Sequence, residues 1–211
     1  MADFLGTLSR LIELKNAKCV YCRRDIPGPD EVCPACLQKQ GRLLNKTGFF
    51  GNYLYVFEYK GIVRKLIHNF KYNDMPYLGV YMAARMASYL NAAAAHFDLI
   101  TYVPIHENRL QWRGFDQSGM LANYLSAQTG VPCRNLLKRT RDTVPQFDLS
   151  RAEREKNVKG AFCAQGTLSL KHTKVLLVDD ICTTGATLKA CAKILEKAGA
   201  VVLPFAYARE T

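Results

Sequence analysis

Two adjacent aspartates and a run of small hydroxyl residues stand near the C-terminus of the chain. The apolar residues 175–178 predict a buried strand, and Asp179 and Asp180 follow it directly. The residues that lead from there into a predicted helix are Thr183, Thr184, Gly185, Ala186 and Thr187. Ligands of open α/β sheets bind beyond the carboxyl ends of the strands, and a helix N-terminus presents backbone N–H groups to an anion. The pattern therefore predicts a loop that binds a phosphate group.

The two carboxylates narrow the kind of ligand that this loop would bind. Carboxylates accept hydrogen bonds from the vicinal hydroxyls of a ribose, so acids beside a phosphate loop favour a sugar phosphate. The P-loop pattern GxxxxGK[ST] and the dinucleotide pattern GxGxxG are both absent from the sequence. The alternative is a strand whose terminal acids only cap the helix that follows.

Four of the cysteines form two CxxC pairs, Cys19 with Cys22 and Cys33 with Cys36, which ten residues separate. Two such turns complete a tetrahedral zinc site, and four protein ligands indicate a structural role because catalytic zinc keeps one position open. Two disulfides are the alternative, which a reducing cytoplasm disfavours. The remaining cysteines have no ligand spacing, and we expect small buried side chains at Cys133, Cys163, Cys182 and Cys191.

The composition is that of a globular protein. The chain has 211 residues, 49% hydrophobic and 22% charged, which excludes disordered and fibrous proteins. We find no apolar run near the ~20 residues that cross a bilayer and expect a cytoplasmic protein without a transmembrane segment. The formal net charge of +11 favours anionic partners, and the excess lies in residues 1–72 and 109–159. Residues 1–18 predict an amphipathic helix that packs on the protein or a partner, with a membrane surface as the alternative.

Strands and helices alternate along the part of the chain that must position these residues. The predicted strands cover residues 49–59, interpreted as a hairpin or an edge strand, 98–104, 174–178 and 200–208. The predicted helices cover residues 61–71, 77–95, 116–129 and 187–198, and Gly130 and Gly199 end the last two. This alternation predicts an α/β fold with a parallel sheet covered on both faces. We expect two domains, a small cysteine module over residues 1–45 and the α/β domain over residues 46–211.

The string from Asp179 to Thr187 resembles the phosphoribosyl pyrophosphate (PRPP) motif of type I phosphoribosyltransferases. Over nearly the whole chain the sequence is similar to the ComF family of competence-associated, phosphoribosyltransferase-like proteins. Besides that string and the CxxC pairs, the residues that carry the similarity are Tyr59-Lys60-Gly61, Phe70-Lys71-Tyr72, Val103-Pro104, Arg113-Gly114-Phe115-Asp116-Gln117, Gln146, Leu149, Arg154, Asn157, Gly160-Ala161-Phe162 and Ala208-Arg209. Asp116 departs from the asparagine expected at its position, which leaves its role open.

The resemblance implies further site residues. Pro104, His106 and Arg109 would form the loop that holds the pyrophosphate of PRPP, although a lone loop histidine is usually polar surface. Residues 139–159 would form a flexible hood that closes over the substrate and excludes water. Its candidate cations are Arg139, Arg141, Arg151, Arg154 and Lys156, for about half of which solvated loop charge is the competing interpretation. PRPP would bring Mg²⁺ with it.

Three functions follow as hypotheses. The first is a PRPP-binding, zinc-stabilised cytoplasmic protein that handles single-stranded DNA during natural transformation, as the family resemblance implies. Aromatic side chains that would stack on bases are Tyr53, Tyr55, Tyr72 and Trp112, with core positions as the alternative. The second is a catalytic phosphoribosyltransferase with an unidentified acceptor. The third is an adaptor that binds a helicase or a DNA-uptake protein through the cysteine module.

Overall fold

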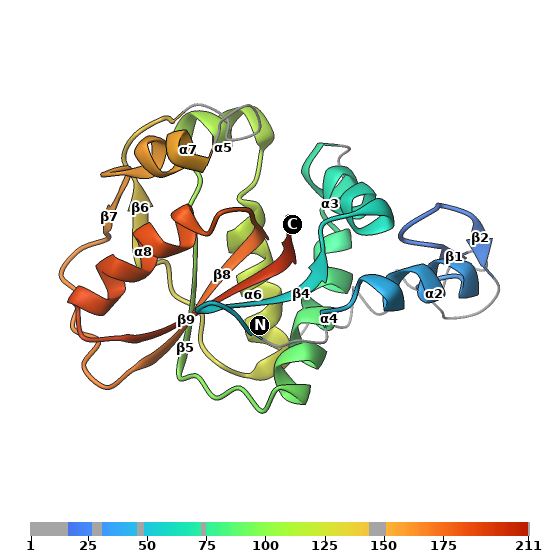
Figure 1. The fold of residues 1–211 in the computed structure, drawn as a ribbon, viewed down its shortest axis with the longest axis horizontal. Coiled ribbons are helices and arrows are strands. Elements are labelled where there is room, and N and C mark those ends of the chain that lie inside the picture. The colour runs from blue at the N-terminus through green and yellow to red at the C-terminus, as the bar shows by residue number, and fades with distance from the viewer. Residues whose placement is uncertain (1–16, 27–30, 46–48, 73–74, 144–150, 211) are drawn as a thin grey trace, which may run out of the picture.

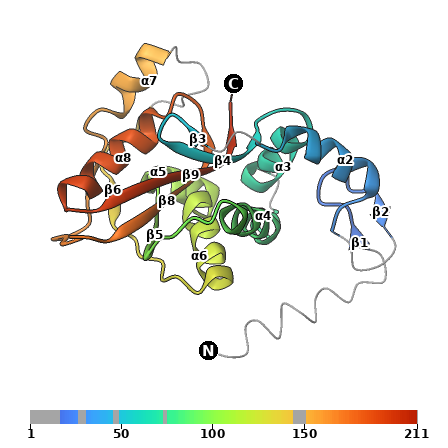
Figure 2. The ribbon, with the colours of Figure 1, turned by 60° about the horizontal axis from the view of Figure 1, so that its bottom comes forward.

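A five-stranded sheet lies at the centre of the protein. The computed structural model describes residues 17–26, 31–45, 49–72, 75–143 and 151–210. The sheet has the strand order β3-β4-β9-β8-β5 (Figures 1 and 2). Its parallel strands are β4 (Tyr53–Glu58), β5 (Leu99–Tyr102), β8 (Lys174–Cys182) and β9 (Val201–Arg209). The edge strand β3 (Phe49–Phe50) pairs antiparallel with β4, as a hairpin requires. The predicted parallel α/β fold is confirmed.

Apolar side chains cover both faces of this sheet. Along β8, Leu176 and Val178 belong to one buried cluster, whereas Val175 and Leu177 belong to the other. Successive side chains of a strand point to opposite faces, so a strand buried on both sides requires an unbroken apolar run. The sequence supplies that run at residues 175–178.

Helices complete the two layers (Figures 1 and 2). The first cluster is built with α3 (Gly61–Tyr72), α4 (Leu78–Ala92) and α6 (Gln117–Thr129). The second is built with α8 (Ala186–Lys197) and a separate two-stranded sheet of β6 (Leu137–Arg139) and β7 (Phe162–Ala164). None of the described helices is long and apolar enough to cross a membrane.

The N-terminal elements lie beside α3 and α4. They are β1 (Ala17–Lys18), β2 (Asp25–Ile26) and α2 (Pro34–Leu43). The ring of Tyr21 meets the ring of Tyr81 edge to face, with centroids 5.8 Å apart, and Gln40 Nε2 donates to the Tyr81 hydroxyl at 2.7 Å. Tyr21 and Cys19 belong to the same buried cluster as α3 and α4. The cysteine-bearing segment therefore packs directly on the α/β body. The amphipathic stretch predicted before it falls mostly on residues 1–16, which lie outside the described residues.

Two elements stand where the sequence predicted a loop or a flexible hood. Helix α5 (Glu107–Arg113) follows β5, because His106 Nδ1 accepts from the backbone N–H of Asn108 at 3.2 Å and Gly114 ends the helix at φ 80°. Helix α7 (Arg151–Val158) lies within the predicted hood, and Arg139, the first residue of that hood, is the last residue of β6. Neither helix shows the long apolar periodicity that identifies a helix in a sequence.

The ends of two predicted elements also differ. Helix α4 stops at Ala92, three residues before the predicted end, in a Schellman turn: Ala94 has φ 47° and the Ala95 N–H donates to Leu90 O at 3.0 Å. Alanine rarely occupies this left-handed position, so the sequence carried no stop signal there. Strand β8 continues past the predicted end to Cys182, because β9 pairs with it along that whole length.

Candidate functional site

A pocket of about 270 Å³ lies at the carboxyl ends of β5 and β8. We call it the acid pocket, because Asp179 and Asp180 lie in its wall. The predicted site residues that line it are Pro104, Arg109, Arg139, Asp179, Asp180, Thr183 and Thr187. These residues come from three separate stretches of the chain. Strands β5 and β8 are neighbours in the sheet, which brings the residues at their carboxyl ends together, and Arg139 reaches the pocket from β6 of the separate two-stranded sheet.

The two acids of this pocket are buried and differ in their partners. Asp179 Oδ1 accepts from the Ser118 hydroxyl and from the Asp180 backbone N–H, both at 2.9 Å. Asp180 Oδ2 lies 2.5 Å from Lys71 Nζ, at the end of α3. Burial, with a further contribution from the Asp180 carboxylate, raises the pKa of Asp179 to about 7 against the opposing effects of Ser118 and Lys71. Asp180 thus carries a paired charge, whereas Asp179 titrates close to neutral pH.

The segment from Thr183 to Thr187, which we call the threonine loop, separates two cavities. Thr183 and Thr187 line the acid pocket, whereas Thr184 and Ala186 line a second, larger cavity on the other side of the loop. Gly185 stands between them at φ 78°, and the Tyr53 hydroxyl donates to its carbonyl at 3.5 Å. The loop is therefore a wall that the two cavities share.

The predicted pyrophosphate loop reaches the pocket with Pro104 and Arg109. Arg109 donates through Nη2 to the Thr143 carbonyl at 2.6 Å, and its Nε lies 3.8 Å from Asp142. His106 caps α5 and lies 3.8 Å from Asp142, and it does not line the acid pocket. The loop is thus fastened to residues 142 and 143, at the start of the predicted hood.

The predicted hood cations take different places. Arg139 lies in β6, is 8% exposed, and lines the acid pocket with its guanidinium over the Phe162 ring. Burial lowers the pKa of Arg139, as does the nearby Arg109, and its Nε is buried with no hydrogen-bond partner in the described part of the chain. An anion in the acid pocket would offset the cost of burying this cation.

Two of the other hood candidates, Arg141 and Lys156, lie elsewhere. Arg141 donates to the backbone carbonyls of Asn157 and Lys159 at 2.6 and 3.0 Å, so it fastens the end of α7. Lys156 lines the second cavity. Arg151 and Arg154 lie in α7, and their side chains fall outside the described residues, as do residues 144–150.

Lys71, Arg113 and Ser118 are among the residues of the acid pocket that were not predicted as site residues. Lys71 and Arg113 do lie within strings that carried the family resemblance, so that comparison was the available signal. Ser118 had none. Asp116, whose role the sequence left open, caps α6: its Oδ1 accepts from the Gly119 N–H at 2.9 Å and its Oδ2 from the Ile105 N–H at 3.3 Å. It therefore joins α6 to the loop after β5.

Tyr72 lines the acid pocket, and its ring lies next to that of Trp112. Tyr72 is 50% exposed and Trp112 74% exposed, with ring centroids 6.4 Å apart. The Arg113 guanidinium lies 5.0 Å from the Tyr72 ring centroid and 5.8 Å from that of Trp112. Tyr55, by contrast, takes the core position that the sequence left as the alternative: its side chain is 7% exposed and belongs to the second buried cluster.

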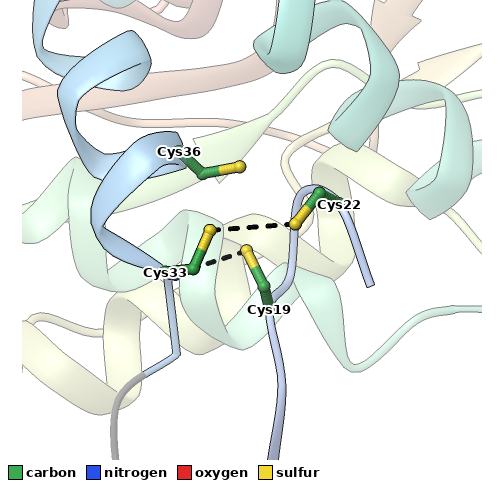
Figure 3. A group of neighbouring side chains, drawn as sticks. All are labelled: Cys19, Cys22, Cys33 and Cys36. Atoms are coloured by element: carbon green, nitrogen blue, oxygen red, sulfur yellow. Dashed lines mark hydrogen bonds between the residues drawn. The ribbon is translucent and has the colours of Figure 1, made fainter. Parts of the chain in front are cut away.

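The four N-terminal cysteines form one cluster (Figure 3). Their sulfur atoms all lie within 4.8 Å of one another, and those of Cys22 and Cys33 are 3.8 Å apart. A tetrahedral site with Zn–S bonds of about 2.3 Å has sulfurs about 3.8 Å apart, so the cluster has the size of a metal site. Burial opposes ionisation of Cys19, yet backbone hydrogen bonds from Cys22, Cys33 and Tyr21 lower its pKa to about 7. These four thiols could hold a metal ion.

Of the other cysteines, Cys182 and Cys191 are buried as predicted. Cys163 is exposed and Cys133 is partly exposed, so the prediction of buried side chains is wrong for these two. Cys163 lies in β7, where alternate residues face solvent.

The sequence matches a known protein family and several named proteins. Residues 75–207 match the family described as "Phosphoribosyl transferase domain". The chain is 31% identical to "Competence protein F" of Haemophilus influenzae, over 86% of this chain and 79% of that protein. It is 28% identical to "DNA utilization protein YhgH" of Escherichia coli K12, over 88% and 86% of the two chains. It is 27% identical to "Competence protein ComFC" of Streptococcus pneumoniae, over 92% and 89%.

Among solved structures, the adenine phosphoribosyltransferase of Thermoanaerobacter pseudethanolicus aligns with a TM-score of 0.44 and 14% identity, covering 82% of this chain and 99% of that one. The assignment rests on the family match and on the sequence relatives. The chain belongs to the phosphoribosyl transferase domain family and, within it, to the ComF competence proteins.

Proposed function

We propose that the acid pocket binds PRPP or a phosphoribosylated ligand. The observation that carries this proposal is the meeting of the two adjacent aspartates, two loop threonines and three arginines in one pocket. Asp179 and Asp180 would accept hydrogen bonds from the ribose hydroxyls, and the loop from Thr183 to Thr187 would bind the 5′-phosphate at the start of α8. Arg109 and Arg139 supply positive charge for the pyrophosphate.

Mg²⁺ fits the same pocket. This ion is held in proteins by one or two carboxylates together with substrate phosphates, and Asp179, Asp180 and Glu210 are the carboxylates that line the pocket. When bound, it would neutralise part of the charge of the pyrophosphate. The role of the chain is to orient the ligand between the acids and the loop, and to exclude water from its reactive carbon.

We further propose that the cysteine cluster holds a structural zinc ion and that the protein acts in the cytoplasm on single-stranded DNA during natural transformation. Four thiols close the coordination sphere, which suits a structural metal. The relatives named for competence and DNA utilisation support the biological setting. The net charge of +11 supports an anionic polymer as partner.

The ligand proposal is tested by calorimetric titration of PRPP with Mg²⁺ into the wild-type protein and into the Asp179→Asn/Asp180→Asn variant. We expect the variant to lose at least tenfold in affinity while it stays folded. Glu196→Gln, an exposed acid on α8, is the matched control and should bind like wild type. Equal affinity of the double variant and the wild type would contradict the assignment of the acid pocket.

Catalysis is the second candidate function. The neighbouring aromatic rings of Tyr72, which lines the acid pocket, and Trp112 favour it. Tyr72 and Trp112 offer exposed planar faces on which an acceptor base could stack. The assay is ³¹P NMR of PRPP and Mg²⁺ with the protein, with nucleobases or single-stranded DNA as acceptor. Pyrophosphate released faster than in the double variant would establish a transferase. Line broadening of PRPP without release would establish a binding protein.

The zinc proposal has its own test. Structural zinc binding is coupled to folding, so Cys33→Ser should lower both the metal content and the melting temperature. Cys163→Ser, at an exposed cysteine outside the cluster, is the control and should change neither. Metal analysis of the purified protein together with a thermal melt gives both readouts. A metal-free wild-type protein with undiminished stability would refute the proposal.

A further inference from the structure

The second cavity, beyond the threonine loop, is lined by five lysines. It measures about 720 Å³, and its lining comes from the end of α7, from α8 and from the turn between β3 and β4. We call it the lysine groove, after the cations that line it: Lys156, Lys159, Lys189, Lys193 and Lys197. No carboxylate is among the described residues that line it. The groove therefore gathers positive charge in a concave surface.

Three of these lysines form a row along α8. Lys189, Lys193 and Lys197 recur every fourth residue, which places them on one side of the helix at intervals of about 6 Å. None of the five lysines forms an ion pair within the described part of the chain. Lys189 stands in the first turn of α8, where the helix dipole disfavours a cation. Helix stability alone does not explain this row, because like charges four residues apart repel each other.

Aromatic and apolar side chains lie among the lysines. Tyr53 of β4 and Phe162 of β7 line the groove, together with Val158 and Ile194. Tyr53 is partly exposed, so one ring is open to a ligand. Sites for single-stranded nucleic acids combine cations that follow the phosphates with rings on which bases stack. The lysine groove has both features.

We propose that the lysine groove binds the sugar–phosphate backbone of single-stranded DNA, outside the acid pocket. This inference rests on the single-strand binding in the proposed function and assigns it a surface. The row on α8 is spaced to contact successive phosphates, and the groove shares a wall with the acid pocket. Thr184 and Ala186 face the strand, whereas Thr183 and Thr187 face the ligand of the acid pocket.

The test compares two triple variants that remove the same charge. The row variant removes the three charges of α8 and is Lys189→Gln/Lys193→Gln/Lys197→Gln. The control variant removes three exposed lysines from other parts of the chain and is Lys39→Gln/Lys65→Gln/Lys171→Gln. Binding of fluorescent oligothymidylate is followed by anisotropy over a range of salt concentrations. We expect the row variant to lose at least tenfold in affinity and the control less than threefold. The slope of log K against log salt should become shallower by about 2, since each single-strand phosphate contributes about 0.7.

The outcomes separate this inference from the proposed function. Wild-type protein that fails to bind the oligonucleotide overturns both the single-strand proposal and the groove. Binding by the wild type with an equal loss in the two variants overturns the groove alone. Duplex bound as tightly as the single strand also overturns it. PRPP titration of the row variant should give the wild-type affinity, and a loss there would show that the groove and the acid pocket are one site.

Discussion

Lys71 and Asp180 form an ion pair beside the acid pocket, with Lys71 Nζ 2.5 Å from Asp180 Oδ2 and side chains that are 17% and 9% exposed. Lys71 comes from the last turn of α3, where a helix favours a cation, and Asp180 comes from β8. The pair therefore joins α3 to the strand that carries both acids, and it balances one of two adjacent negative charges.

Replacing this lysine should destabilise the protein. Lys71→Met leaves two neighbouring buried carboxylates without their cation, and we expect a loss of roughly 1–3 kcal/mol in the free energy of unfolding at pH 8. Urea denaturation measures the change. Lys65→Met, at an exposed position of the same helix, should stay within about 0.5 kcal/mol of wild type. Equal stability of the two variants would show that the ion pair has no net effect.

The pH dependence of stability follows from Asp179. Burial raises its pKa from 3.8 to about 7. The folded state thus favours the neutral carboxyl, and the resulting stabilisation is complete below pH 4 and is lost as the pH rises through 7. Asp179→Asn stays neutral at every pH. Relative to wild type, we expect this variant to gain of the order of 4 kcal/mol between pH 4 and pH 8, measured by urea denaturation. A difference that does not change with pH would contradict the raised pKa.

The strand, the acids and the threonine loop could be located from the sequence because they are consecutive. An apolar run followed by acids, hydroxyl residues and a helix is one local unit, and its chemistry depends on neighbours along the chain. The predicted residues Asp179, Thr183 and Thr187 indeed line one pocket. The hairpin before α3 and the glycine that ends α6 follow from the same local rules.

The other side chains of the pocket depend on long-range packing. Lys71 and Ser118 reach the acids from α3 and α6, and their position follows from how these helices pack on the sheet. No spacing in the chain encodes that packing. Arg139 and Arg141 show the same limit: two residues apart in the sequence, one lines the pocket and the other binds backbone carbonyls of residues 157 and 159.

Asp116 should matter for stability through its two hydrogen bonds. Asp116→Ala removes the cap of α6 and the contact with the Ile105 N–H, and we expect a loss of about 1–2 kcal/mol. Asp116→Asn keeps an oxygen for the Gly119 N–H and should lose less than the alanine variant. Thermal melts of the two variants and the wild type give the order. An equal loss in the two variants would show that its charge, and not the cap oxygen, is what stabilises the helix.

Gly185 should tolerate a side chain less well than another glycine with the same backbone angle. At Gly185, with φ +78°, an added Cβ would lie 2.6 Å from the Tyr53 ring, whereas at Gly166, with φ +77°, it would meet nothing within 4 Å. Gly166→Ala therefore measures backbone strain alone, about 1–2 kcal/mol, and Gly185→Ala adds a clash of about 1–3 kcal/mol. Truncating the ring in Tyr53→Ala should remove that second part, which a double-mutant cycle followed by urea denaturation measures. If Gly185→Ala costs the same with and without the Tyr53 ring, the contact between this ring and the threonine loop does not constrain the loop.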